Sequence, residues 1–123
     1  MHPPRVAAGV ARCYIFPMSF TLHDLEKRVA DRATANAEVS YTRKLMDRGT
    51  AHCAKKLGEE AVETVLAAVS EDRERLIGEA ADLLYHLLVV LHMRDIRLAE
   101  VEEALAQRTR RSGLDEKASR KGD

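Results

Sequence analysis

The chain has 123 residues, of which 33% are charged and only 4% are aromatic, and its 20 basic side chains balance 20 acidic ones. This length suits one domain, and the scarcity of aromatic residues favours an all-helical fold over a β-sandwich. The balanced charge excludes a global attraction to nucleic acid or to an anionic membrane. Cys13 and Cys53 show neither a disulfide framework nor zinc-ligand spacing, which indicates a reducing, cytoplasmic environment.

Residues 1–17 precede the first helical pattern. They contain prolines at positions 3, 4 and 17 and arginines at positions 5 and 12, so they lack the unbroken apolar centre of a secretion signal. We expect them to be a disordered lead, or to lie upstream of a true translation start at Met18. The helical domain is then predicted over residues 18–112.

Two helices are expected in the first part of this domain. The first begins after Thr21, an N-cap residue whose backbone can pair with Asp24, and it ends near Asn36. A short helix or turn follows at residues 40–45. Gly49 is suited to end that segment, because glycine adopts the left-handed conformation without strain.

The third and fourth helices form the centre of the chain. Thr50 is the expected N-cap of the third helix, which ends near Ser70, and Asp72 is the expected cap of the fourth. The predicted inward face of the third helix consists of Ala54, Leu57, Ala61, Val65 and Val69. The apolar residues of the fourth helix are Leu76, Ile77, Ala80, Leu83, Leu84, Leu87, Leu88 and Leu91. They cover more than one stripe, which predicts burial on several sides and hence a partner chain.

The longest apolar stretch, residues 83–91, is shorter than the ~20 residues that a membrane-spanning helix needs. We therefore expect a buried helix and no membrane association. A fifth helix is predicted from Leu98 to about Arg110, followed by a charged tail over residues 113–123. Nucleic acid is not an expected partner.

Two pairs of acidic residues have the spacing of a shared site. Glu60 and Glu63 lie three residues apart on one face of the third helix, and Glu79 and Asp82 repeat that spacing on the fourth. Glu63 and Glu79 are equally distant from the turn centred near Glu71, as are Glu60 and Asp82. Equidistant residues lie level in an antiparallel hairpin, so we expect four carboxylates to converge beside an apolar seam.

Converging carboxylates repel one another and resist desolvation, so they must bind a cation or take up protons. A set of oxygen ligands without sulfur favours Mg²⁺, with Mn²⁺ as the alternative, over Zn²⁺. Mg²⁺ commonly accompanies polyphosphates in phosphoryl-group displacement, so the pattern indicates a nucleotide substrate. The competing interpretation is that these acids are solvated surface residues, as most helical Glu and Asp are.

Other polar residues surround these acids in the sequence. Glu59 points about a quarter-turn away from Glu60 and is interpreted as a residue behind the ligands. Lys55 and Lys56 each lie four residues before an acid, so they are open to a helix-stabilising ion pair as well as to phosphate binding. His86 either orients a carboxylate, contacts the substrate or is a buried structural histidine.

The segments KKLGEEAVE, residues 55–63, and EAADLLYHLLVVL, residues 79–91, resemble the phosphoribosyl-ATP pyrophosphatase family. SYTRKL at residues 40–45 and SGLDEKASRK at residues 112–121 extend the resemblance over most of the chain from about Phe20 onward. The acidic elements alone are shared with the wider all-α nucleotide pyrophosphohydrolases, which include the MazG proteins. The SYT segment and the YH pair after the acids are similar to the histidine-pathway branch.

The resemblance implies hydrolysis of 1-(5-phosphoribosyl)-ATP to 1-(5-phosphoribosyl)-AMP and pyrophosphate, the second step of histidine biosynthesis. It implies a stand-alone enzyme whose antiparallel bundle of about four to five helices is completed by homodimerisation. Carried onto this sequence, it makes Glu60, Glu63, Glu79 and Asp82 the magnesium ligands and catalytic acids, with Glu59 as the auxiliary catalytic acid.

Residues close to these acids in the sequence are candidates for binding the substrate. They are Tyr41, Thr42, Arg43, Lys44, Lys55, Lys56 and His86. For Ser40, Tyr41 and Thr42, a helix cap and a packed ring at a helix start is an equally good interpretation.

Two other functions stay open at this point. One is a house-cleaning pyrophosphohydrolase of the MazG type, which acts on non-canonical or deoxy nucleoside triphosphates. The other is a non-catalytic helical dimerisation module, whose surface acids only confer solubility.

Overall fold

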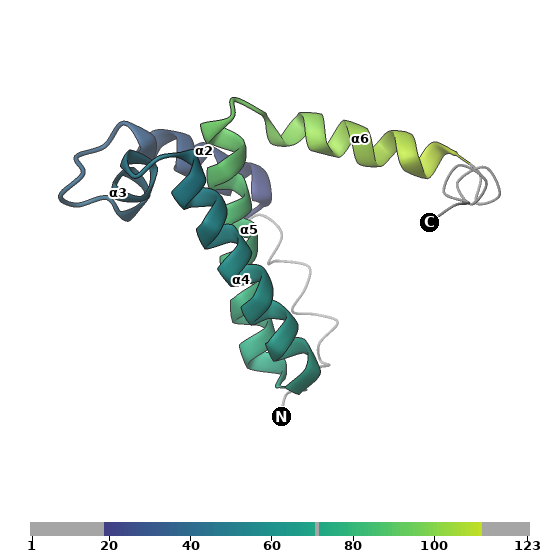
Figure 1. Ribbon diagram of the computed structural model, residues 1–123. Coiled ribbons are helices and arrows are strands. Elements are labelled where there is room, and N and C mark those ends of the chain that lie inside the picture. Colours follow the sequence, from purple (N-terminus) through teal and green to yellow (C-terminus); the bar gives the residue numbers. More distant parts are fainter. Residues whose placement is uncertain (1–18, 71, 112–123) are drawn as a thin grey trace.

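The computed structural model describes residues 19–70 and 72–111. Its described part is all-helical, without a strand, and consists of α2 (Leu22–Ala33), α3 (Tyr41–Asp47), α4 (Thr50–Ser70), α5 (Arg73–Met93) and α6 (Leu98–Arg110). Helices α4 and α5 form a long antiparallel hairpin, with α2 and α3 packed at one end (Figure 1). The all-α prediction is confirmed. The predictions for residues 1–17 and 113–123 lie outside the described residues.

Short polar side chains fix the helix ends. The Thr21 hydroxyl accepts a hydrogen bond from the Asp24 backbone N–H at 3.1 Å, and the Asp24 carboxylate accepts one from the Thr21 N–H at 2.9 Å. Asp72 caps α5 as predicted. Gly49 has a φ of 98°, the left-handed conformation expected of it. Thr50 is itself the first residue of α4, so the predicted N-cap is displaced by one residue.

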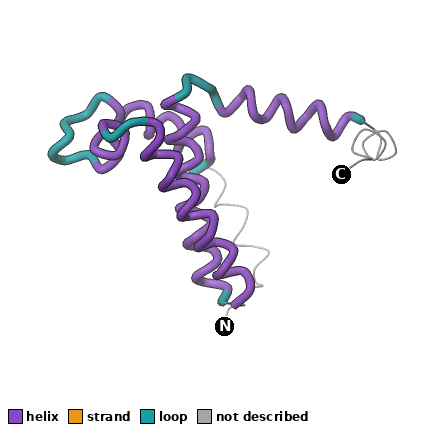
Figure 2. The backbone as a smooth tube through the Cα atoms, in the orientation of Figure 1, coloured by secondary structure: helices purple, strands orange, loops and turns teal. Residues whose placement is uncertain are grey.

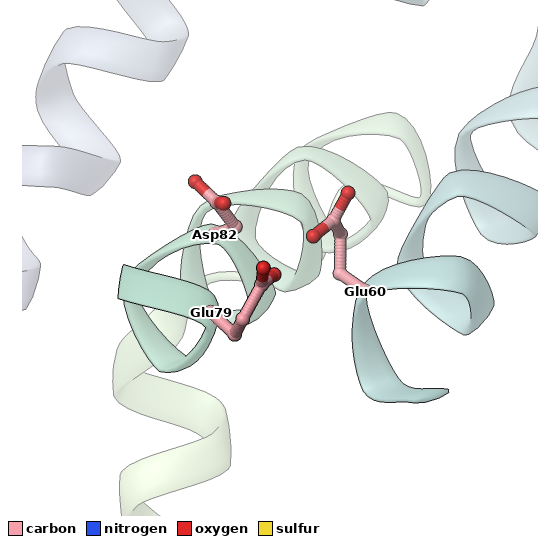
Figure 3. A group of neighbouring side chains, drawn as sticks. All are labelled: Glu60, Glu79 and Asp82. Atoms are coloured by element: carbon pink, nitrogen blue, oxygen red, sulfur yellow. The ribbon is translucent and has the colours of Figure 1, made fainter. Parts of the chain in front are cut away.

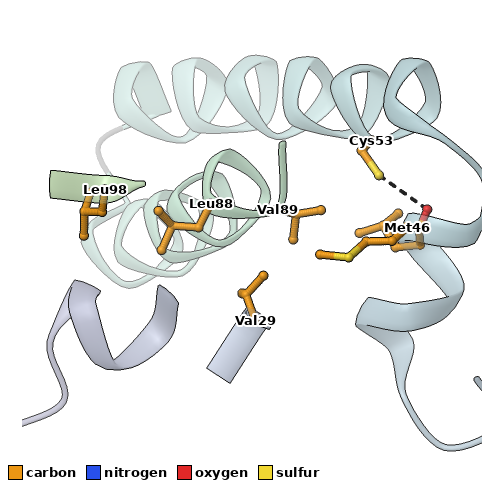
Figure 4. Packing of buried hydrophobic residues seen from close by; sticks show 7 residues of the cluster. Val29, Met46, Cys53, Leu88, Val89 and Leu98 are labelled. Atoms are coloured by element: carbon orange, nitrogen blue, oxygen red, sulfur yellow. Dashed lines mark hydrogen bonds between the residues drawn. The ribbon is translucent and has the colours of Figure 1, made fainter. Parts of the chain in front are cut away.

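The buried core ties α2, α3 and the start of α6 to one end of the hairpin (Figure 4). Its members are Val29, Leu45, Met46, Cys53, Leu88, Val89 and Leu98. Cys53 is fully buried, and its thiol donates to the Leu45 carbonyl oxygen at 3.4 Å. Burial raises the pKa of the Cys53 thiol. Cys53 is thus a packing residue of the core.

The predicted inward face of α4 is only partly confirmed for the single chain, because Leu57 and Ala61 are partly buried but the other three residues are exposed. Ala54 is exposed, and Val65 and Val69 are 60% and 72% exposed. A second row of buried and partly buried positions at three- and four-residue spacing consists of Cys53, Lys56, Glu60, Thr64 and Ala67. Polar residues Lys56, Glu60 and Thr64 lie in this row, whereas Val65 and Val69 lie on a surface that stays exposed in the single chain.

Helix α5 is also more exposed than predicted. Ile77 is 54% and Leu84 38% exposed, although burial on several sides was expected. The helix has 21 residues, and an 18-residue window within it has a mean hydropathy of 1.4, so by length and composition alone it could span a membrane, contrary to the inference from residues 83–91. This is weak support for a span, because core helices pass the same test, and Glu79 and Asp82 lie within it.

Helix α6 leaves the hairpin and extends away from it as an arm (Figure 2). Its bounds match the prediction, but only Leu98 is buried, and Leu105 is 53% exposed. The base of the arm is held by α2: the Glu26 carboxylate accepts a hydrogen bond from the Leu98 N–H at 2.7 Å. The same helix supplies His23, whose Nε2 lies 3.0 Å from the Glu102 carboxylate.

Candidate active site

Three carboxylates converge across the middle of the hairpin (Figure 3). Glu60 comes from α4, and Glu79 and Asp82 come from α5. One ligand oxygen of each lies within 4.8 Å of the others. We call these three residues the carboxylate trio. Glu60 and Glu79 are partly buried and Asp82 is exposed, so the trio lines a surface that a substrate can reach.

The Thr64 side chain connects α4 to α5 beside the trio. The Thr64 hydroxyl lies 2.7 Å from the Glu60 carbonyl oxygen and 3.2 Å from the Glu79 carbonyl oxygen. It therefore joins the backbone of α4 to the backbone of α5 beside the trio. Sequence reasoning did not single out Thr64, because a threonine one turn after a glutamate has no distinctive signal.

Negative charge accumulates at the trio without compensation. Among the described residues, no lysine or arginine forms an ion pair with Glu60, Glu79 or Asp82. Burial raises the pKa of Glu79, and the charges of Glu60 and Glu63 raise it further. Three close carboxylate oxygens in this environment fit a hard divalent cation, which would relieve the repulsion. The trio is thus a candidate metal centre.

Glu63, the predicted fourth member, does not join the trio. Its carboxylate lies 3.3 Å from a guanidinium nitrogen of Arg75. Three residues advance about 300° around a helix, so Glu63 is rotated by about 60° from Glu60. Its side chain leaves the seam, and Thr64 takes the position facing α5. The structure therefore brings three of the four predicted ligands together.

The lysines next to the trio are paired with Glu59. Lys56 Nζ lies 3.2 Å and Lys55 Nζ 3.9 Å from the Glu59 carboxylate. The ion pair between Lys55 and Glu59 is as predicted, whereas Lys56 pairs with Glu59 instead of Glu60. The hydrogen bond between Lys56 and Glu59 lowers the pKa of the acid and raises that of the lysine. Glu60 is left free for the trio.

The start of α3 combines capping with ring packing. The Ser40 hydroxyl accepts a hydrogen bond from the Arg43 N–H at 3.0 Å, which confirms the helix-cap interpretation. Thr42 is only 4% exposed, and its hydroxyl lies 2.6 Å from the Tyr85 hydroxyl. Tyr41 stacks on the Tyr85 ring with the centroids 6.4 Å apart, but it is 57% exposed. Of these candidates, Tyr41 is the one open to a substrate.

Arg43 and His86 are engaged within the fold. The Arg43 side chain binds the Asp47 carboxylate at 2.9 Å and the Ala35 carbonyl oxygen at 2.9 Å. His86 is 6% exposed, and its ring meets the Tyr85 ring edge-on at 4.9 Å. Burial lowers the pKa of His86, and so does Lys56. Its Nδ1 atom is buried without a hydrogen-bond partner in the described part of the chain.

A small basic pocket lies between α3 and the start of α4. It has a volume of about 290 Å³ and is lined by Tyr41, Lys44, Leu45, Arg48, His52 and Lys56. Three of these were predicted to bind substrate, whereas Arg48 and His52 were missed. The available signal was the four-residue spacing of His52, Lys56 and Glu60. A larger cavity of about 520 Å³ between α2, α5 and the start of α6 contains no member of the trio.

An antiparallel helical hairpin that presents converging carboxylates from both of its helices is consistent with the class of all-α nucleotide pyrophosphohydrolases. A family model described as phosphoribosyl-ATP pyrophosphohydrolase matches residues 22–109. The chain belongs to the phosphoribosyl-ATP pyrophosphohydrolase family.

Curated relatives agree with this membership. Phosphoribosyl-ATP pyrophosphatase 1 of Bradyrhizobium diazoefficiens is 65% identical over 102 residues, which cover 83% of this chain and 96% of the relative. The protein of the same name from Rhodopseudomonas palustris is 62% identical over 104 residues, with 85% and 97% covered. The phosphoribosyl-ATP pyrophosphatase of Rhizobium meliloti is 59% identical over 101 residues, with 82% and 94% covered.

Proposed function

We propose that this protein hydrolyses 1-(5-phosphoribosyl)-ATP to 1-(5-phosphoribosyl)-AMP and pyrophosphate, the second step of histidine biosynthesis, in the cytoplasm. The observation that carries the proposal is the carboxylate trio, situated within the region matched by the family model. The relatives named above bear the name of this activity. A buried free cysteine, Cys53, is compatible with a reducing compartment.

In this proposal Glu60, Glu79 and Asp82 hold Mg²⁺, and Mn²⁺ suits the same set of oxygen atoms. Glu63 is the fourth ligand and must exchange its ion pair with Arg75 for the site. When bound, the ion neutralises phosphate charge and acts as a Lewis acid toward the phosphate oxygens. Glu59 is the auxiliary acid in this proposal, and its ion pair with Lys56 favours its ionised form.

The substrate-binding residues divide into two groups. Tyr41, Lys44 and Lys56 line the basic pocket and bind the substrate directly, with the exposed Lys55 beside them. The second group positions the residues around the site and does not contact the substrate, because its side chains are buried or bound to other residues of the chain. It consists of Thr42, Arg43 and His86.

A second copy of the chain covers the apolar face of the hairpin in this proposal. The exposed large apolar side chains on α4 and α5 are Val62, Val65, Leu66, Val69, Ile77 and Leu84. Val62, Val65, Leu66 and Val69 share one stripe of α4 by their three- and four-residue spacing, and an exposed apolar surface of this kind is typical of a protein interface. We therefore propose a homodimer, and sedimentation equilibrium of the full chain would measure its mass. A monomer at micromolar concentration would contradict this part of the proposal.

The catalytic test measures pyrophosphate release with Mg²⁺ from phosphoribosyl-ATP, ATP, dUTP and dCTP. We expect release from phosphoribosyl-ATP to be far faster than from the others. Comparable rates across the panel would favour the house-cleaning alternative. Asp82→Asn should reduce the rate by more than about 100-fold, because loss of a ligand costs more than loss of a residue behind it.

The matched control is Asp31→Asn, an exposed acid on α2 outside the trio. This variant should keep the wild-type rate. If Asp82→Asn also keeps its rate and its dependence on Mg²⁺, then the trio is not the catalytic site and a non-catalytic role of these acids gains support.

A further inference from the structure

The basic pocket has the composition of an anion site. Its charged lining residues, Lys44, Arg48 and Lys56, are all cationic, and no acid lines it. Within the described residues Lys44 and Arg48 form no ion pair, whereas Lys56 is paired with Glu59. Lysine and arginine that converge on a cavity without an acidic partner are suited to bind a phosphate group.

The pocket continues into the carboxylate trio along one stripe of α4. His52, Lys56 and Glu60 recur every four residues, and all three are partly buried. At a rise of 1.5 Å per residue, Lys56 and Glu60 are separated by about 6 Å along the helix axis, and His52 and Glu60 by about 12 Å. One elongated ligand can therefore contact the pocket and the trio at the same time.

Phosphoribosyl-ATP has phosphate at two ends, a triphosphate and a phosphate monoester on the added ribose. Three carboxylates repel a bare triphosphate, so this end requires a cation at the trio. The monoester requires direct hydrogen-bond donors and positive charge, which the pocket supplies. We propose that the basic pocket binds the 5-phosphate of the phosphoribosyl group through Arg48, Lys44, Lys56 and His52, and so distinguishes the substrate from ATP. This proposal rests on the proposed function.

The pKa of His52 responds to the positive charges that line this pocket. Burial lowers the pKa of His52, and the charges of Arg48, Lys55 and Lys56 lower it further, opposed by Glu59. Tyr41 and Lys44 face it from α3 across the pocket. A phosphate bound among these groups offsets their positive charge, so it raises the pKa of His52. This change can be followed without any catalytic turnover.

The kinetic test uses Arg48→Gln in the full chain. We expect KM for phosphoribosyl-ATP to rise by roughly tenfold or more, because a hydrogen bond to a charged group is lost. The inhibition constant of ATP, which lacks the phosphoribosyl group, should not change. Arg48→Lys keeps the charge and should recover part of the effect. Arg73→Gln, an exposed arginine at the far end of the hairpin, is the control that leaves KM unchanged.

The binding test follows the His52 ring by NMR during titration with ribose 5-phosphate. In the wild type the pKa of His52 should rise to a saturating value, and in Arg48→Gln this rise should be lost. If Arg48→Gln weakens ATP inhibition by the same factor as it raises KM, the pocket binds the triphosphate and our assignment is wrong. Ribose 5-phosphate that leaves His52 unchanged would overturn it as well.

The two proposals fail in different ways. A wild-type protein that releases no pyrophosphate from phosphoribosyl-ATP refutes the proposed function. A wild-type protein that is active, with an Arg48→Gln variant of unchanged KM, refutes only the assignment of the pocket.

Discussion

Glu79→Gln should change stability in opposite directions without and with a divalent cation. Burial and the charges of Glu60 and Glu63 raise the pKa of Glu79 in the folded protein. A raised pKa means that the native state binds this proton more tightly than the unfolded state does. The contribution of Glu79 to the free energy of unfolding is therefore present at low pH and is lost as the pH rises through the raised pKa. At neutral pH without metal, the neutral amide should stabilise the protein.

With Mg²⁺ the effect reverses. At a free concentration of about 100 times Kd, binding to the native state adds about 2.7 kcal/mol to the free energy of unfolding, which raises Tm by roughly 10 °C in a domain of this size. The variant keeps two of the three carboxylates of the trio. If the loss weakens Kd about 100-fold, the same concentration adds only about 0.4 kcal/mol.

Thermal unfolding measured by circular dichroism tests both effects. In EDTA the Tm of Glu79→Gln should exceed that of the wild type, and across an Mg²⁺ titration it should rise less. Glu74→Gln is the matched control, since Glu74 is an exposed acid on the same helix outside the trio. Its response to Mg²⁺ should equal that of the wild type. An equal Mg²⁺-dependent rise in Tm for Glu79→Gln would refute the assignment of this residue as a ligand, and no rise in the wild type would refute the metal centre.

Three further changes test other parts of the fold. Thr42→Val and Tyr85→Phe should each lower the free energy of unfolding in urea by about 1–3 kcal/mol, because each leaves one hydroxyl of a part-buried pair without its hydrogen-bond partner. The double variant should lose less than the sum of the two, and strict additivity would show that the pair is not coupled. Val65→Asp should shift sedimentation toward monomer while the helical circular dichroism persists; an unchanged mass would exclude this face from the interface. Asp72→Ala should cost about 1 kcal/mol through loss of the α5 cap, and an unchanged urea midpoint would contradict that.

The ends of the helices could be predicted because local chemistry determines them. Thr21 with Asp24, Asp72 and Gly49 act through hydrogen bonds or backbone conformations within a few residues. The convergence of acids from two helices could also be predicted, because a hairpin with a short turn relates residues by their distance from that turn. These signals require no knowledge of distant packing.

The rotation of each helix about its own axis could not be predicted in this way. The apolar stripe of α4 indicated Val65 and Val69 as inward-facing, but the face toward α5 carries Glu60 and Thr64. Apolar periodicity reports burial in the final assembly and does not separate a contact within one chain from a contact between chains. Three-residue spacing likewise predicted Glu63 beside Glu60, but it does not report the rotation of about 60° with which the Glu63 carboxylate meets Arg75.

The pairing of Lys56 leaves the acidic centre without a compensating lysine in the described part of the chain. Four-residue spacing would allow an ion pair between Lys56 and Glu60, which would relieve the repulsion within the trio. Lys56 instead pairs with Glu59, and Glu60 remains beside Glu79 and Asp82 without a cationic partner among the described residues. An acidic centre and a basic pocket thus lie about one helical turn apart without neutralising each other. Both charges stay available to a ligand that carries a cation at one end and a phosphate at the other.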